Sequence, residues 1–177
     1  MNAVGMEGFD LSLRDGLSVH IREICISDEA EFLQAFEGLS QEARYMRFMR
    51  IVREPDLNRV RKALASFPEG GVGVVATVPA ADGIDIVGSA VSVFSHDLSR
   101  CEFAITVASA FSGKGLATAL MKTIIDESTR RGPEKMEGFV LAENRRMLGL
   151  ARRLGFSITP EPGDATVRIC HMALGKP

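Results

Sequence analysis

Tryptophan, tyrosine, cysteine and histidine are scarce in this sequence. Its 177 residues include no Trp, one Tyr, three Cys and three His. Cys25, Cys101 and Cys170 are odd in number and far apart, which excludes a disulfide framework and favours a reducing compartment, the cytoplasm. The histidines do not have the spacing of metal ligands, so no metal site is expected.

An excess of one charge and a long apolar run are also lacking. The chain has 21 Lys and Arg against 23 Asp and Glu, so it lacks the basic surplus of proteins that bind nucleic acid non-specifically. The most apolar region, 71–94, is interrupted by Pro79, Asp82 and Asp85, and nothing in it is suited to span a membrane. Residues 1–5 do not begin a signal peptide. We therefore expect a cytoplasmic protein without a nucleic-acid or membrane partner.

A strand, a glycine-containing loop and a long helix are predicted between residues 100 and 131. Residues 101–107 alternate apolar and polar side chains, as a strand does, and apolar residues then recur at helical spacing from Gly115 onward. Gly113 and Gly115 allow the backbone to approach a ligand, and the first N–H groups of the helix favour phosphate. The loop lacks residues of the nucleotide-binding P-loop and the third glycine of the dinucleotide fingerprint. A plain glycine turn before a core helix is the alternative.

A second strand and helix follow at residues 136–156. Residues 136–143 are mostly apolar, and Asn144 is suited to cap the helix that comes next. Apolar side chains in that helix recur at spacings of three and four residues. Gly155 can end it in the left-handed conformation, with Phe156 packing back on it.

These two segments resemble motifs A and B of the GNAT acetyltransferase superfamily. Residues 112–117 (SGKGLA) are similar to motif A, Q/R-x-x-G-x-G/A, although Ser112 stands where the family usually has Gln or Arg. Residues 144–156 are similar to motif B, an Asn followed by a short helix that ends in L-G-F. The resemblance implies acetyl-CoA as cosubstrate and two central strands that splay apart to admit its pantetheine arm.

The predicted order of elements agrees with that fold. It runs strand, two or three helices, three strands, helix, strand, helix and two strands. Hairpins give antiparallel pairs, and the strand–helix–strand crossovers require a parallel pair. We expect an α/β protein whose central mixed sheet is flanked by helices, with a loose segment at 1–12 and a single domain at 13–177.

A narrower resemblance points to one subgroup. Residues 13–22, 39–48 (LSQEARYMRF) and 101–104 (CEFA) are similar to segments of the GNAT domain in bacterial protein-lysine acetyltransferases that modify acyl-CoA synthetases. In that subgroup the Glu of the last segment is taken as the general base. The resemblance therefore implies Glu102 as base and a protein lysine as acceptor.

The chemistry of amine acetylation independently favours Glu102. A lysine amine is mostly protonated at pH 7, so a base must accept a proton, directly or through water. Glu102 shares its predicted strand face with small residues that leave room for a ligand. The alternative is a structural pairing of Glu102 with Arg44 or Arg47. Many GNAT enzymes have a Tyr as general acid at the position of Ala151, so that role is unassigned here.

The resemblance also assigns residues to the coenzyme. Backbone groups of the strand are expected to hold the pantetheine, and the loop and first helical turn are expected to surround the pyrophosphate. Lys114 either attracts the phosphates or faces solvent, and Asn144 is first a helix cap and by analogy a coenzyme contact. The full set is Ile105, Thr106, Val107, Ser112, Gly113, Lys114, Gly115, Leu116, Ala117, Thr118 and Asn144.

The helix predicted at 41–50 interleaves basic and apolar residues. Arg44, Tyr45 and Arg47 are candidates for the wall of the acceptor site, and a solvent-exposed arginine face is the alternative. The leading function is acetyl-CoA-dependent transfer of an acetyl group to a primary amine, with a protein lysine favoured, by a monomer or homodimer. A small-molecule amine acetyltransferase, a non-catalytic acyl-CoA sensor and a nucleotide-binding protein are the alternatives.

Overall fold

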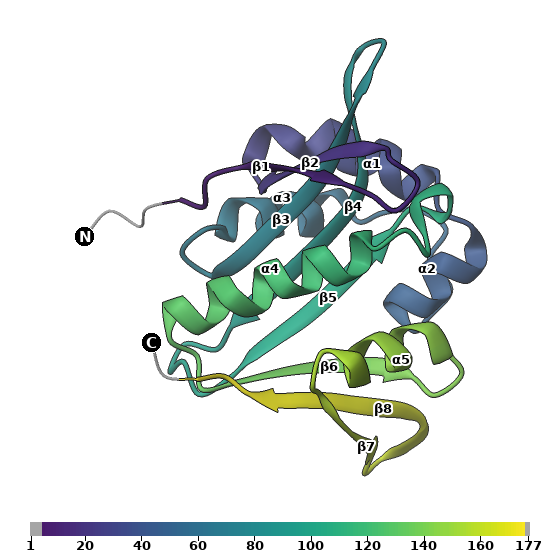
Figure 1. Ribbon diagram of the computed structural model, residues 1–177. Coiled ribbons are helices and arrows are strands. Elements are labelled where there is room, and N and C mark those ends of the chain that lie inside the picture. The colour runs from purple at the N-terminus through teal and green to yellow at the C-terminus, as the bar shows by residue number, and fades with distance from the viewer. Residues whose placement is uncertain (1–4, 176–177) are drawn as a thin grey trace.

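The computed structural model describes residues 5–175, and its strands form a single mixed sheet (Figure 1). The eight strands have the order β1-β2-β3-β4-β5-β6-β8-β7. Neighbours are antiparallel except for β5 and β6, which are parallel. The strands are β1 (Phe9–Ser12), β2 (Ser18–Glu23), β3 (Gly71–Ala80), β4 (Gly83–Phe94), β5 (Cys101–Val107), β6 (Lys135–Leu141), β7 (Ser157–Glu161) and β8 (Asp164–Ala173).

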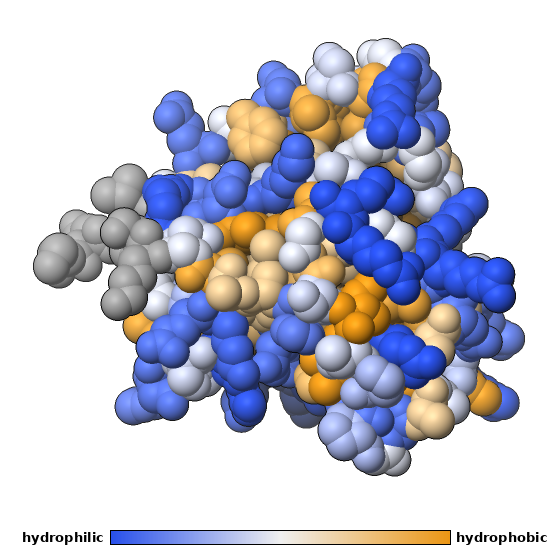
Figure 2. Space-filling model, turned by 60° about the horizontal axis from the view of Figure 1, so that its bottom comes forward, coloured by the Kyte–Doolittle hydropathy of each residue, from blue (hydrophilic) through white to orange (hydrophobic). Residues whose placement is uncertain are grey.

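Helices cover both faces of the sheet. They are α1 (Glu29–Glu37), α2 (Gln41–Phe48), α3 (Leu57–Ser66), α4 (Leu116–Arg131) and α5 (Arg145–Arg153). Alternation along β3 separates two cores, because Val74 packs in the cluster with α4 and α5 whereas Val75 packs in the cluster with α1 and α3. Among residues 5–175, no helix is long and apolar enough to cross a membrane. Figure 2 shows one face on which strongly hydrophilic side chains surround an apolar area.

The N-terminal segment differs from the sequence-based expectation. Residues 9–12, assigned above to a loose segment, form β1 and pair with β2 from Phe9↔Ile21 to Ser12↔Ser18. The strand has only four residues, too few to stand out by alternation, and its order comes from backbone pairing with β2. Gly16, with φ 85°, provides the left-handed turn between them. Residues 1–4 of that segment lie outside the described residues.

A buried ion pair joins β2 to α1. Asp28 is 3% exposed and accepts hydrogen bonds from Nη1 and Nη2 of Arg22 at 2.9 and 2.7 Å, and from the Cys25 N–H at 2.9 Å. Burial alone would raise the pKa of Asp28, but these hydrogen bonds outweigh it and hold the pKa below its usual value. The pair fixes the chain at the point where it leaves the sheet for the helices.

The two parallel strands β5 and β6 diverge soon after they begin. Their pairing is limited to Cys101↔Met136 and Glu102↔Glu137. Beyond that point β5 remains paired with β4, and β6 with β8, as the divergence of the two arrows in Figure 1 shows. The β6-facing edge of residues 103–107 is therefore open. This agrees with the splayed central strands that the resemblance implied.

Candidate active site

The loop from β5 to α4 presents uncapped N–H groups at the start of a long helix. It passes through a 3₁₀ turn at Ser109–Phe111, and Gly113 and Gly115 then adopt positive φ of 75° and 95°. Gly115 is the N-cap of α4, and among the described residues no side chain caps the first turn. These N–H groups and the helix dipole favour an anion at this position.

Lys114 in this loop is ion-paired. Its Nζ lies 2.7 Å from Oδ2 of Asp15, and the hydrogen bond from Lys114 holds the pKa of Asp15 below its usual value. The backbone N–H of Arg14 donates to the Lys114 carbonyl at 3.1 Å. The β1–β2 turn thus holds the loop, and Asp15 neutralises much of the charge that Lys114 would offer to phosphate.

Arg146 on α5 is a loop neighbour that the sequence analysis missed. Its Nη1 donates to Oγ of Ser112 at 3.1 Å. The available signal was a pair of arginines, Arg145 and Arg146, directly after the predicted cap. Asn144 is that cap, because its side chain accepts from the Met147 N–H at 3.1 Å, which confirms its local role. Its contact with a coenzyme stays a prediction.

Glu102 lies at the place where β5 and β6 separate. Its side chain is exposed, and its cross-strand partner Glu137 is on the same face of the sheet. Lys135 Nζ lies 2.7 Å from Oε1 of Glu137, which makes that carboxylate the less available of the two. Glu137 is a second acid that the sequence analysis missed, because only the parallel register places it beside Glu102.

The α2 helix packs beside the strands that carry these two acids, since it contacts both β5 and β6. Arg47 is half-buried there. Burial lowers the pKa of the Arg47 guanidinium, and the negative charge of Glu102 opposes that shift. Arg47 is therefore the arginine of α2 on which the charge of Glu102 acts.

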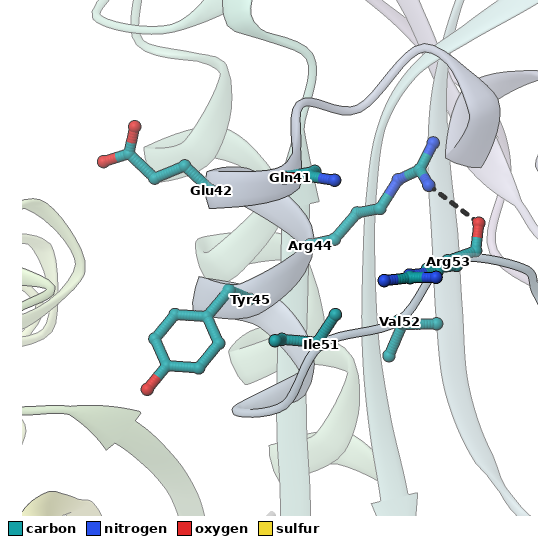
Figure 3. Close-up of a pocket in the computed structure, with 7 residues that line it drawn as sticks. All are labelled: Gln41, Glu42, Arg44, Tyr45, Ile51, Val52 and Arg53. Carbon is teal, nitrogen blue, oxygen red and sulfur yellow. Dashed lines mark hydrogen bonds between the residues drawn. The ribbon is translucent and has the colours of Figure 1, made fainter.

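Arg44 turns in another direction. Its guanidinium donates to the carbonyl of Arg53 at 2.9 Å and to that of Glu37 at 3.1 Å, and it lies 4.3 Å from the centre of the Phe36 ring. Figure 3 shows the hydrogen bond from Arg44 to the Arg53 carbonyl. In the same view the Tyr45 side chain points away from Arg44. These contacts favour a structural role for Arg44.

A pocket of about 530 Å³ lies between α2 and the segment that follows it (Figure 3). Tyr45, which is 38% exposed, lies on its wall. The lining residues are Gln41, Glu42, Arg44, Tyr45, Ile51, Val52 and Arg53. Two of the three predicted acceptor residues therefore border this pocket, and Arg47 is instead coupled to Glu102.

Residues 18–157 match the family described as the acetyltransferase (GNAT) domain. The chain belongs to the GNAT acetyltransferase family. It is 30% identical over 163 residues to Acetyltransferase PA5475 of Pseudomonas aeruginosa, a match that covers 92% of this chain and 88% of the relative. The family and this relative identify the chain as an enzyme, an N-acetyltransferase.

Solved structures show the same GNAT fold. The GNAT domain of S. lividans PAT has a TM-score of 0.84 and 22% identity, with 94% of this chain and 97% of that domain covered. The yncA protein of Salmonella typhimurium, solved with its cofactor acetyl-CoA, has a TM-score of 0.67 and 22% identity, with 89% of this chain and 95% of that one covered.

Within this GNAT domain the remaining candidate residues of the strand lie on β5, directly before the loop. Ile105, Thr106 and Val107 are half-buried on the strand whose edge is open, and the loop begins directly after them. Ala151, at the position where many family members have a Tyr, is fully buried in the core with α4. The general acid therefore stays unassigned.

Proposed function

We propose that this enzyme transfers the acetyl group of acetyl-CoA to a primary amine, with a protein lysine as acceptor and Glu102 as general base. The observation that supports this most is the separation of β5 from β6 directly beyond Glu102, with the glycine loop at the other end of the same strand. Five residues of strand at about 3.3 Å each give roughly 17 Å between Glu102 and Val107. That length accommodates an extended pantetheine arm.

The coenzyme would lie along β5. Its diphosphate would meet the N–H groups that begin α4, at residues 113–118, and its arm would lie beside the open edge of residues 105–107. Backbone N–H groups at that edge are the donors available to polarise the thioester carbonyl. The thioester would then reach the level of Glu102.

Glu102 would accept a proton from the ammonium of the acceptor, directly or through one water. The amine nitrogen then attacks the carbonyl carbon, an N–C bond forms, the C–S bond breaks, and the electron pair leaves with the sulfur. The second proton that the nitrogen loses as the amide forms goes to this thiolate, directly or through water.

The surface near α2 supports a protein acceptor over a small amine. Tyr45 is 38%, Met49 39% and Ile51 79% exposed, in the last turn of α2 and just after it. Exposed apolar groups of this kind suit contact with a polypeptide around the target lysine. The narrower resemblance of residues 39–48 agrees with this acceptor. A cytoplasmic location and a monomeric or homodimeric state stay predictions from the sequence.

Replacement of Glu102 by Gln tests the base. We expect kcat/KM to fall by about 10²–10⁴-fold, with coenzyme A affinity unchanged, because the loop lies a strand's length away. Glu137→Gln is the matched control and should retain the parental rate. Near-parental kcat/KM for Glu102→Gln would mean that catalysis is mainly positioning of amine against thioester. A parent protein that binds coenzyme A without releasing thiol, whatever amine is offered, would instead be an acyl-CoA sensor.

A further inference from the structure

The first position of motif A is filled by a small side chain, and the guanidinium of a residue distant in the sequence forms a hydrogen bond with it. Ser112 stands where the family usually has Gln or Arg, and Nη1 of Arg146 donates to its Oγ at 3.1 Å. Arg146 lies 34 residues later in the sequence, in the first turn of α5. The structure thus brings a guanidinium back to the position from which the motif has lost a long polar side chain.

Two other cationic side chains, those of Lys114 and Arg14, lie near the loop. Lys114 is ion-paired with Asp15 at 2.7 Å. Arg14 approaches the loop at Gly115, where its Nε would be 3.9 Å from a Cβ added to that glycine. Arg146 is exposed, and the Ser112 bond uses only one of the five N–H donors of its guanidinium. Its planar fork suits a phosphate group, which can accept two parallel hydrogen bonds.

We propose that Arg146, oriented by the Ser112 hydroxyl, binds the diphosphate of acetyl-CoA in place of the motif's missing Gln or Arg. The proposal rests on the proposed function, because it deepens the coenzyme site. While Oγ of Ser112 accepts from Arg146, its own O–H is available to donate to a phosphate oxygen. The two side chains together offer donors beside the N–H groups at the start of α4.

Calorimetry with coenzyme A and 3′-dephospho-coenzyme A tests this. Arg146→Ala should weaken both ligands by the same factor, about tenfold or more, because a charge-assisted hydrogen bond to the shared diphosphate is lost. Arg145→Ala removes the same charge from the preceding residue and should change affinity by less than about threefold. Ser112→Arg in the Arg146→Ala background returns the family's side chain to the loop and should restore most of the affinity.

An acetyl donor without phosphates distinguishes diphosphate binding by Arg146 from a structural contact of Arg146 between α5 and the loop. With S-acetylpantetheine the kcat/KM of Arg146→Ala should equal that of the parent, because the contact with diphosphate is absent from both reactions. An equal loss with this donor would mean that Arg146 only braces α5 against the loop, and would overturn the proposal. Thermal melts of each variant identify any loss of affinity or rate that comes from unfolding. If Arg146→Ala does not fold, Arg146→Lys, which retains the charge, takes its place in both assays.

Two other results would also overturn the proposal. Unchanged affinity of Arg146→Ala for both coenzymes would remove the residue from the site, while the proposed function would stand. Weakened binding of coenzyme A alone would assign Arg146 to the 3′-phosphate instead of the diphosphate. A parent protein that binds neither coenzyme would refute the proposed function itself, so the two failures are distinguishable.

Discussion

Gly138 on β6 lies beneath the ring of Phe103 on β5, at the point where these strands begin to separate. A Cβ added to Gly138 would lie less than 3.0 Å from three carbons of that ring, closer than real Cβ atoms come to their neighbours. The ring is 5% exposed and packs edge-to-face on Phe156 at a centroid distance of 5.2 Å, so it has little room to move. Gly138→Ala should therefore force the core apart beside the coenzyme strand.

The expected cost follows from this packing. Overfilling a packed core costs about 1–3 kcal/mol, and replacing a strand Gly by Ala returns about 0.5–1 kcal/mol. The net loss in free energy of unfolding should be on the order of 1–2 kcal/mol. In a domain of this size that lowers Tm by roughly 2–8 °C. Urea unfolding and thermal melts measure both quantities, and calorimetry shows whether coenzyme A binding weakens with them.

Two further variants make this prediction sharp. Gly163→Ala is the matched control, because within residues 5–175 no atom beyond its chain neighbours lies within 4 Å of the added Cβ, and it should leave Tm unchanged or slightly higher. Phe103→Leu shortens the opposing side chain, so the double variant should lose less stability than the two single losses added together. If Gly138→Ala is as stable as the parent, the close packing of Phe103 on Gly138 is refuted.

Three further predictions follow from the loop, the buried ion pair and α2. Gly115→Glu places an anion at the start of α4 and strains a left-handed position, and calorimetry should show coenzyme A affinity at least about tenfold lower; a folded variant with parental affinity would remove this loop from the site. Asp28→Asn should lower the free energy of unfolding by about 2–3 kcal/mol at pH 7. Because the folded pKa of Asp28 is depressed, the parent's advantage should be complete above its unfolded pKa of about 3.9 and should vanish as pH falls through the folded value, as urea unfolding across pH would show. Arg44→Ala should cost about 1–3 kcal/mol of stability with the acceptor KM almost unchanged; a higher KM at parental stability would return Arg44 to the acceptor site.

Local patterns in the sequence predicted most of the fold. Apolar residues occupy every second position of β5 from Cys101 to Val107, and α5 has a side-chain cap at Asn144 with Gly155 in the left-handed conformation after it. Such signals depend on neighbouring residues only, which is why they can be read without a structure. β1 was missed because four residues show little periodicity and its order depends on β2.

The candidate site was predicted less completely, because its polar contacts join distant segments. The pairing of Glu102 with Glu137 depends on the register of two parallel strands, and the bond from Arg146 to Ser112 depends on where α5 docks. Arg44 and Arg47 are equivalent by helical spacing, and only the fold distinguishes the one that bonds two carbonyls from the one whose pKa responds to the charge of Glu102. Spacing along a sequence contains none of this information.

Incubation of the protein with labelled acetyl-CoA and a cell lysate tests the central claim most directly. We predict label in amide linkage on protein lysines, released thiol in equal amount, and neither product above background with Glu102→Gln. Label confined to small amines would contradict a protein acceptor. A parent protein that binds coenzyme A yet transfers no label to any amine would contradict the account as a whole.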